Sequence, residues 1–294
     1  MAYLITSPGS CGEFIQGYAK GSSFMVTCPI NRYSYALSGF DGPGDTLPPK
    51  AQKAVRLTLN YLHHESDEIA IKLKSYIPRG KGMASSTADI SAVCQAAAMS
   101  VGKRLSNQEI AEIALSIEPS DATFFDGIIE FDYREGKIIR EIGKSPDMQI
   151  LIYDCGGEID TMIFNSRNDL IKLQKSNEAD IVKAMDLFRK GIKTNSLDLI
   201  GEATTISAFA NQKILYKNQL NDFYEKGMLL GGKGVICAHS GTVLGLILPM
   251  EISAEKVRDA LYDFHLNITY LDTVRAVNEG MRITECSDNE FNRK

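Results

Sequence analysis

The stretch Pro78–Ile90, with the sequence PRGKGMASSTADI, decides how this chain folds. Just before it, apolar and other residues alternate over Ile69–Leu73, which predicts a half-buried strand. Gly80 and Gly82 then allow tight backbone turns that other residues resist. Three hydroxyl residues, Ser85–Thr87, open a long run of helix formers. A glycine turn therefore leads into a helix start, where free N–H groups bind anions, and the anion we expect is a nucleotide phosphate.

Two familiar phosphate motifs do not describe this stretch. It does not contain GxxxxGK followed by Ser or Thr, so it is not a P-loop. Gly80, Gly82 and Ser85 follow GxGxxG only in part, because the third glycine is missing and no acidic ribose ligand stands about 20 residues further on at a strand end. A Ser/Thr-capped helix after a glycine loop would explain the same residues without any ligand, and this alternative stays open from the stretch alone.

Composition predicts an ordinary globular protein. The 294 residues are 44% hydrophobic and 23% charged, enough for one large or two moderate domains. The net charge of −5, without a basic run, argues against nucleic acid as a partner. We expect no membrane partner and no signal peptide, because no apolar run is long enough and the N-terminus lacks the charged and apolar regions of a leader. Six scattered cysteines without CxxC spacing favour free thiols in a reducing cytoplasm over zinc or disulfides.

The hydrophobic pattern along the chain predicts an α+β fold in two parts, residues 1–150 and 151–294. Residues 7–18 are rich in turn formers and predict a loop, and the last eight residues look disordered. Ser106 and Glu109 form a capping box at a helix start. We expect strands over 2–6, 24–28, 33–37, 69–73, 128–131, 138–142, 148–153, 235–238, 243–248 and 268–274. We expect helices after the central stretch and over 50–63, 106–117, 181–188, 197–209, 220–229 and 253–264.

The central stretch is longer than a simple capped helix requires. Its pattern, Pro-x-x-x-Gly-x-x-Ser-Ser-x-Ala, resembles the phosphate-binding motif of the GHMP kinase superfamily, which contains kinases for galactose, homoserine, mevalonate and phosphomevalonate. The resemblance implies a two-domain α+β GHMP kinase fold with the active site in the cleft between domains, ATP as phosphoryl donor and Mg²⁺ as cofactor. It also implies a Gly/Pro-rich loop near the nucleoside, here residues 40–49. The implied phosphate-binding residues are Pro78, Gly80, Lys81, Gly82, Met83, Ala84, Ser85, Ser86, Thr87 and Ala88.

The same resemblance implies where the metal and the catalytic carboxylate lie. Ser86 matches the hydroxyl ligand of Mg²⁺, and its carboxylate partner falls on Glu112 by the spacing of mevalonate-kinase-like members, although the element is two residues shorter here. Asp121, in the sequence EPSDATFFDG, resembles the catalytic aspartate that accepts or orients the proton of the acceptor hydroxyl. Asp126 is the rival in the same loop. A solvated helix face remains an equal explanation for Glu112.

Two further motifs lie near the ends of the chain. Glu13, in SPGSCGE, resembles the family's first motif near the acceptor, and the alternative is a loop carboxylate in water. Some relatives place a lysine after Pro-Gly, whereas this chain has Ser10, so a cation near the transferred phosphoryl group is missing. ICAHSGTVLG resembles the glycine-rich C-terminal segment, with Ser240, Gly241 and Thr242 as implied substrate-binding residues, and the alternative is a plain hairpin turn.

Within the superfamily, PGSCGEFIQG, RGKGMASSTADI and EPSD most resemble the kinases that phosphorylate free L-threonine to L-threonine O-3-phosphate for cobalamin synthesis. The expected small-molecule partners are therefore L-threonine and ATP, and a homodimer stays open. One alternative is another GHMP kinase, acting on homoserine or an isoprenoid precursor. A second is a non-catalytic GHMP-fold sensor, although a sensor has no need of metal ligands together with a base.

Overall fold

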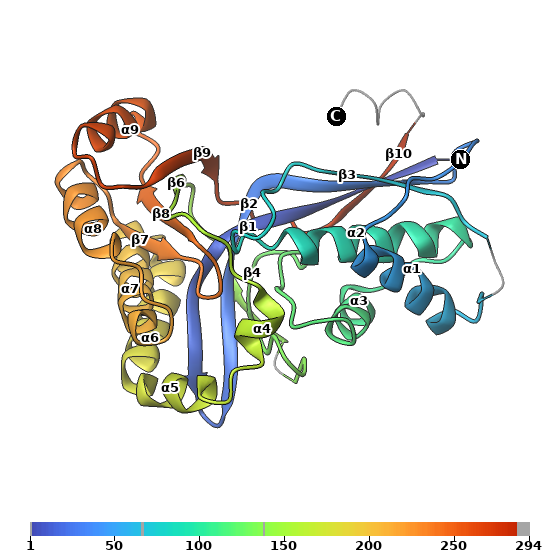
Figure 1. Ribbon diagram of the computed structural model, residues 1–294, viewed down its shortest axis with the longest axis horizontal. Coiled ribbons are helices and arrows are strands. Elements are labelled where there is room, and N and C mark those ends of the chain that lie inside the picture. Colours follow the sequence, from blue (N-terminus) through green and yellow to red (C-terminus); the bar gives the residue numbers. More distant parts are fainter. Residues whose placement is uncertain (1, 66–67, 138, 287–294) are drawn as a thin grey trace.

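Two long paired strands form the spine of the molecule (Figure 1). The computed structural model describes residues 2–65, 68–137 and 139–286, so the last eight residues, predicted to be disordered, lie outside the described part. β1 runs over Ala2–Ala19 and β2 over Ser22–Ser38, and the two pair antiparallel along their length. Their pairing brings the start of the chain beside the segment that leads into the first helix.

β1 contains the segment that turn residues predict to be a loop, so that prediction is wrong. Three register shifts between Pro8 and Ile15 interrupt the pairing with β2, and Gly12 has a φ of 64°. Such bulges accept glycine and proline inside a strand and bend it. β2 likewise runs unbroken through the two separate strands predicted over 24–28 and 33–37. Turn residues here therefore bend a strand instead of ending it.

The described strands form one sheet that joins both halves of the chain. Its order is β5-β4-β2-β1-β7-β8-β6-β9, with β3 paired to β2 and β10 to β1. β10, which the sequence pattern does not predict, returns to the start of the chain and pairs Cys286 with Ala2. The division of the chain at residue 150 stays a prediction, because the sheet crosses it. The remaining strands are β3 (Ile71–Ser75), β4 (Ile128–Phe131), β5 (Ile139–Gly143), β6 (Gln149–Asp154), β7 (Gly234–Cys237), β8 (Val243–Leu248), β9 (Thr269–Arg275) and β10 (Arg282–Cys286).

The helices gather in two groups. α1–α3 lie at one end of the molecule and α5–α9 at the other, and β1 and β2 pass through both (Figure 1). The predicted capping box of α3 is confirmed, since Ser106 and Glu109 bond reciprocally. The helices are α1 (Pro49–Tyr61), α2 (Ser85–Ser100), α3 (Asn107–Leu115), α4 (Thr161–Asn165), α5 (Leu170–Ser176), α6 (Glu178–Thr194), α7 (Leu197–Ala210), α8 (Leu220–Leu229) and α9 (Ala254–Asp263), with a 3₁₀ turn at Asn211–Lys213.

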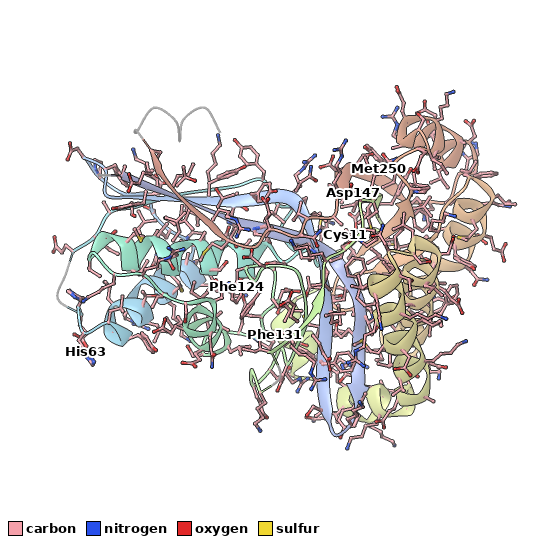
Figure 2. All side chains as sticks on the ribbon, turned by 180° about the vertical axis from the view of Figure 1, so that it is seen from behind. Cys11, His63, Phe124, Phe131, Asp147 and Met250 are labelled. Atoms are coloured by element: carbon pink, nitrogen blue, oxygen red, sulfur yellow. The ribbon has the colours of Figure 1, made fainter. Side chains whose placement is uncertain are left out.

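The two groups of helices pack on separate apolar cores, and in the second group α8 and α9 have a core apart from that of α6 and α7. Phe124 and Phe131 belong to the core between α1, α2 and α3, whereas Cys11 belongs to the core beneath α6 and α7 (Figure 2). α2 is buried on every side from Thr87 to Ala98, as expected for a helix without a polar face. The N-terminus of α2 is consequently held in a fixed place, which is what a phosphate-binding helix requires.

Candidate active site

A cavity of about 490 Å³ is lined by residues from both halves of the chain. This volume falls within the range of small-molecule sites, roughly 300–1,000 Å³. The lining includes residues of β1, β2 and the start of α1, together with Glu118, Pro119, Asp121, Ser240 and, near α4, Ile159, Asp160 and Asn165. From the predicted phosphate-binding stretch it includes Gly80, Gly82, Met83, Ala84, Ser85, Ser86 and Thr87.

The glycine turn before α2 packs directly against another backbone segment. Gly80 and Gly82 have φ of 70° and 80°, and Ala84, which precedes the first helical residue, has φ of 55°. A Cβ at Gly82 would lie 2.5 Å from the Cβ of Ala238 and 2.8 Å from the Cα of Gly241. Only glycine therefore lets this loop lie directly on the segment between β7 and β8.

The hydroxyl groups at the start of α2 do not cap the helix. The N-cap residue is Ala84, and no side chain accepts a hydrogen bond from the first turn. Ser86 instead donates its hydroxyl to Glu118 Oε1, and Thr87 donates to Asp121 Oδ2 at 3.4 Å. The capped-helix explanation is thus wrong, and these hydroxyls line the cavity together with the free N–H groups of the first turn.

Glu118, and not Glu112, is the carboxylate beside Ser86. Glu118 is buried and pairs with Lys50 Nζ at 2.5 Å through Oε2. Glu112 lies on the exposed face of α3 and does not line the cavity. The structure therefore does not bring Glu112 to Ser86. The count along the sequence placed the partner six residues too early, whereas the sequence EPSD holds Glu118 immediately before the proline that follows the helix.

Asp121 lies in the cavity wall with a mixed set of neighbours. Its Oδ1 accepts from Thr27 Oγ1 at 3.2 Å, and its backbone N–H donates to Thr87 Oγ1 at 3.2 Å. Burial, with the nearby Glu13 and Glu118 carboxylates, raises the pKa of Asp121 to about 7, against the hydrogen bonds from Thr27 and Thr87 that lower it. A carboxylate with a pKa near neutrality can both accept and release a proton at physiological pH.

Asp126, the rival in the same loop, has a different role. It is exposed and pairs with Arg282 Nη1 at 2.7 Å, and it accepts from the N–H of Gly280 at 2.9 Å. Partial burial raises the pKa of Asp126, but the Gly280 N–H and the Arg282 guanidinium outweigh it and lower the pKa. It does not line the cavity. Its contacts connect the loop to Gly280 and to the first residue of β10.

Glu13 is buried in the cavity wall and is held by His239. Glu13 Oε2 accepts from the His239 backbone N–H at 2.8 Å and lies 3.1 Å from His239 Nδ1. On the far side of the ring, Nε2 lies 3.0 Å from Ser207 Oγ. Burial alone would lower the pKa of His239, but Cys237 and Glu13 outweigh it and raise the pKa to about 10. Glu13 is therefore not a loop carboxylate in water.

Several predicted contact residues act behind the cavity instead of lining it. Lys81, predicted to contact a phosphate, pairs with Asp154 at 2.7 Å and does not line the cavity. Thr242 donates its N–H to the Lys81 carbonyl at 3.0 Å, and Gly241 packs against Gly82. Of the C-terminal motif, only Ser240 lines the cavity. Pro78 and Ala88, two further predicted contacts, also lie outside its lining.

The cavity wall contains two cations that sequence reasoning missed. Lys50 pairs with Glu118, and Arg79 Nη2 pairs with Asp89 at 2.8 Å. Lys50 directly follows the Gly/Pro-rich loop expected near the nucleoside, and this position in the sequence could have indicated that Lys50 lies at the cavity. Ser10, which replaces the lysine of some relatives, is buried and donates its N–H to the Met83 carbonyl at 2.9 Å. Cationic charge therefore comes from α1 and from the phosphate loop.

The residues that the structure describes contain no group of three or more His, Cys, Asp or Glu side chains placed to hold a metal ion. A magnesium site need not have one, because Mg²⁺ in phosphoryl-transfer sites is bound by one or two protein ligands with phosphate and water.

Among the residues that the structure describes, no helix combines the length and apolar character that crossing a membrane requires.

A hydroxyl-lined helix start that faces two carboxylates agrees with the small-molecule kinases of the GHMP type that the sequence resembles. Residues 50–126 match the family described as GHMP kinases N terminal domain. The chain belongs to the GHMP kinase family. It is 33% identical over 244 residues to an L-threonine kinase of Salmonella typhimurium, covering 82% of this chain and 81% of that protein.

Solved structures confirm the fold. The mevalonate kinase of Methanococcus jannaschii superposes with a TM-score of 0.70 at 16% identity, over 94% of this chain and 98% of that one. A homoserine kinase from Cytophaga hutchinsonii superposes with a TM-score of 0.64 at 17% identity, over 96% of this chain and 97% of that one. At this identity the likeness concerns the fold, so the acceptor has to be argued from the site.

Proposed function

We propose that this protein transfers the γ-phosphoryl group of ATP to the side-chain hydroxyl of free L-threonine, giving L-threonine O-3-phosphate for cobalamin synthesis. The observation that carries the proposal is the pairing of Ser86 with Glu118 and of Thr87 with Asp121 at one helix start. The similarity to the Salmonella L-threonine kinase supports the choice of acceptor. The phosphates of ATP would lie on the glycine turn and the N-terminus of α2.

The residues present suit Mg²⁺. Ser86 and Glu118 supply two hard oxygen ligands in contact with one another at the cavity wall, where the helix start would hold the phosphates. When bound there, the metal ion would neutralise charge on the β- and γ-phosphates. Lys50, bonded to the second oxygen of Glu118, orients that carboxylate and adds positive charge to the same wall.

Asp121 would act on the acceptor. In the transfer, the threonine oxygen forms a bond to the γ-phosphorus, the bond from that phosphorus to the bridging oxygen breaks, and ADP leaves. The hydroxyl proton passes to Asp121, whose raised pKa makes it an acceptor that can later release the proton to water. Thr27 and Thr87 hold the two Asp121 oxygens in place while this happens.

A comparison of acceptors tests the proposal. ADP release would be measured with L-threonine, L-serine, L-homoserine and mevalonate at saturating ATP and Mg²⁺, and the product from L-threonine identified by phosphorus NMR. We expect L-threonine to give the highest kcat/KM. A preference for homoserine or mevalonate would point to another GHMP kinase. Binding of ligands without ADP release from any acceptor would point to a sensor.

A further inference from the structure

A second cavity lies between α9, the turn that follows it and the strands β6 and β9, in the group of helices away from α1–α3 (Figure 1). Its volume is about 440 Å³, within the range of small-molecule sites. None of the described residues lines both this cavity and the active-site cavity. Aromatic rings make up much of its lining, and they belong to Tyr153, Tyr262, His265 and Tyr270.

The hydroxyl of Tyr153 is the unsatisfied polar group of this cavity. Tyr153 is 4% exposed, and its hydroxyl has no hydrogen-bond partner among the residues that the structure describes. A buried tyrosine hydroxyl normally has one, because leaving it unpaired costs its hydration. Burial raises the pKa of this phenol to about 12, and the other groups that act on it, Tyr270, Arg258 and Asp259, also line the cavity. The hydroxyl therefore lies on the cavity side of β6.

The neighbouring Tyr270 shows the opposite arrangement. The rings of Tyr153 and Tyr270 meet edge to face, with 5.6 Å between their centroids. The Tyr270 hydroxyl lies 2.9 Å from Thr273 Oγ1, so the protein itself satisfies it. Of the two hydroxyls in this aromatic pair, that of Tyr153 is consequently the one that can donate to a ligand.

The charged groups of the cavity favour an uncharged ligand. Arg258 and Asp259 both line it and pair with each other, and Arg258 also pairs with Glu255 outside the lining. The cation and the anion of the lining thus balance, which leaves no net charge to attract an ion. Both hydrogen bonds from Arg258, at 3.0 and 2.8 Å, go to Oδ1 of Asp259. The second oxygen, Oδ2, can accept from a donor of the ligand.

The side chains around the hydroxyl leave room for a planar ring. Because the Tyr153 oxygen is buried, a ligand reaches it when an outer side chain moves aside. Arg258 can do so, since the carboxylates that it pairs with are exposed and such ion pairs contribute little to stability. Tyr262 is 77% exposed, so its ring is available to a ligand. Tyrosine rings and a guanidinium plane both stack on aromatic groups.

We propose that this cavity is a second small-molecule site, which takes an uncharged planar aromatic molecule with an acceptor and a donor side by side on its edge. The acceptor would bind the Tyr153 hydroxyl and the donor would bind Asp259, as a carboxamide or the edge of a nucleobase allows. The site is separate from phosphoryl transfer, so the inference does not depend on which acceptor the kinase uses.

Benzamide is the probe for this site, and benzoate, which has almost the same shape but carries a negative charge, is its control. Both would be titrated into the full chain and followed by ligand-observed NMR, with ADP and L-threonine in excess to occupy the active-site cavity. We expect saturable binding of benzamide and much weaker binding of benzoate. Benzamide that ADP or L-threonine displaces would belong to the active-site cavity, and this result would overturn the inference. The absence of saturable benzamide binding at millimolar concentrations would overturn it as well.

Two variants that each remove one hydroxyl from the cavity assign the contact. Tyr153→Phe should weaken benzamide binding by about 2- to 10-fold, as expected for one neutral hydrogen bond, without lowering the melting temperature of the ligand-free protein. Tyr270→Phe should bind benzamide as the wild type does and melt at a lower temperature, because Thr273 loses its partner. If Tyr153→Phe instead binds benzamide like the wild type and melts at a lower temperature, the hydroxyl serves the fold and the inference is wrong.

Discussion

Four carboxylates between residues 112 and 126 divide into two regions, one that faces the cavity and one that faces away. Glu118 and Asp121 face the cavity and accept hydrogen bonds from hydroxyl groups of α2. Glu112 lies on the exposed side of α3, and Asp126 pairs with Arg282 at the surface. The residue types are the same in both regions, so chemistry alone does not separate them. Their surroundings do.

The difference shows how the fold assigns a role to a carboxylate. Burial, with the nearby Glu13 and Glu118 carboxylates, raises the pKa of Asp121 to about 7 against its hydroxyl partners, whereas Gly280 and Arg282 lower the pKa of Asp126 in spite of partial burial. A proton acceptor needs the first environment, and a structural ion pair needs the second. Matched substitutions in the two regions test this division.

The largest effect is expected from Asp121. Asp121→Asn keeps the shape of the side chain but removes the proton acceptor, so kcat should fall by roughly 100- to 10,000-fold. The KM for ATP should change little, because the help is felt in the transition state. Asp126→Asn, measured at the same saturating ATP and L-threonine, should remain close to wild type. A crippled Asp126→Asn beside a nearly normal Asp121→Asn would reverse the assignment of the two regions.

The second comparison concerns Glu118 and Glu112. Glu118→Gln removes a charged oxygen ligand beside Ser86, so the Mg²⁺ concentration for half-maximal activity should rise by about 10- to 100-fold, as for other lost metal-site contacts. Ser86→Ala should act in the same direction. Glu112→Gln serves as the control and should give the wild-type Mg²⁺ titration. Equal titrations for Glu118→Gln and wild type would remove Glu118 from the metal site.

Sequence patterns predicted the cavity-facing region only in part. The helix start at Ser85 and the EPSD loop were found because glycine, proline and hydroxyl residues act locally on the backbone. Which carboxylate reaches Ser86 depends on how α3 ends against α2, a tertiary contact 32 residues apart in sequence. Spacing within a helix cannot report that contact, so Glu112 was chosen in place of Glu118.

The full length of strands β1 and β2 could not be predicted from the local sequence pattern either. Pro8, Gly9 and Gly12 read as turn residues, yet they lie in β1 because bulges absorb them while the strand keeps its partner β2. β10 was missed since its short sequence gains its place from pairing with β1, at the opposite end of the chain. The pairing of His239 with Glu13 was missed because the two residues lie 226 positions apart in the sequence.

A smaller effect is expected from pH. Asp121 has to be ionised to accept a proton, and its pKa is raised to about 7. At saturating substrates, kcat should therefore be level above pH 7.5 and fall below pH 7, by roughly tenfold for each unit. The residual activity of Asp121→Asn should lack this limb, whereas Asp126→Asn should keep it. A wild-type profile that stays level down to pH 5 would mean that positioning alone carries the reaction.

The smallest effect is on stability, and it should have opposite signs in the two regions. The pKa of Asp121 is raised by folding, so its stabilising contribution is complete below the unfolded value near 3.8 and is lost as pH rises to about 7. Asp121→Asn removes a charge that the fold disfavours, and at pH 8 its melting temperature should exceed that of the wild type by about 2–4 °C, the shift that about 1 kcal/mol gives for a chain somewhat smaller than this one. At pH 4 the two should melt together.

The pKa of Asp126 is lowered, so its contribution to stability is present above pH 4 and is lost as pH falls further. Since its ion pair is exposed, Asp126→Asn should lower the melting temperature at pH 8 by no more than about 2 °C. Calorimetric scans at the two pH values give both signs. If Asp121→Asn melts below the wild type at pH 8, the Asp121 carboxylate stabilises the fold as an anion, and the surroundings assigned to it here are wrong.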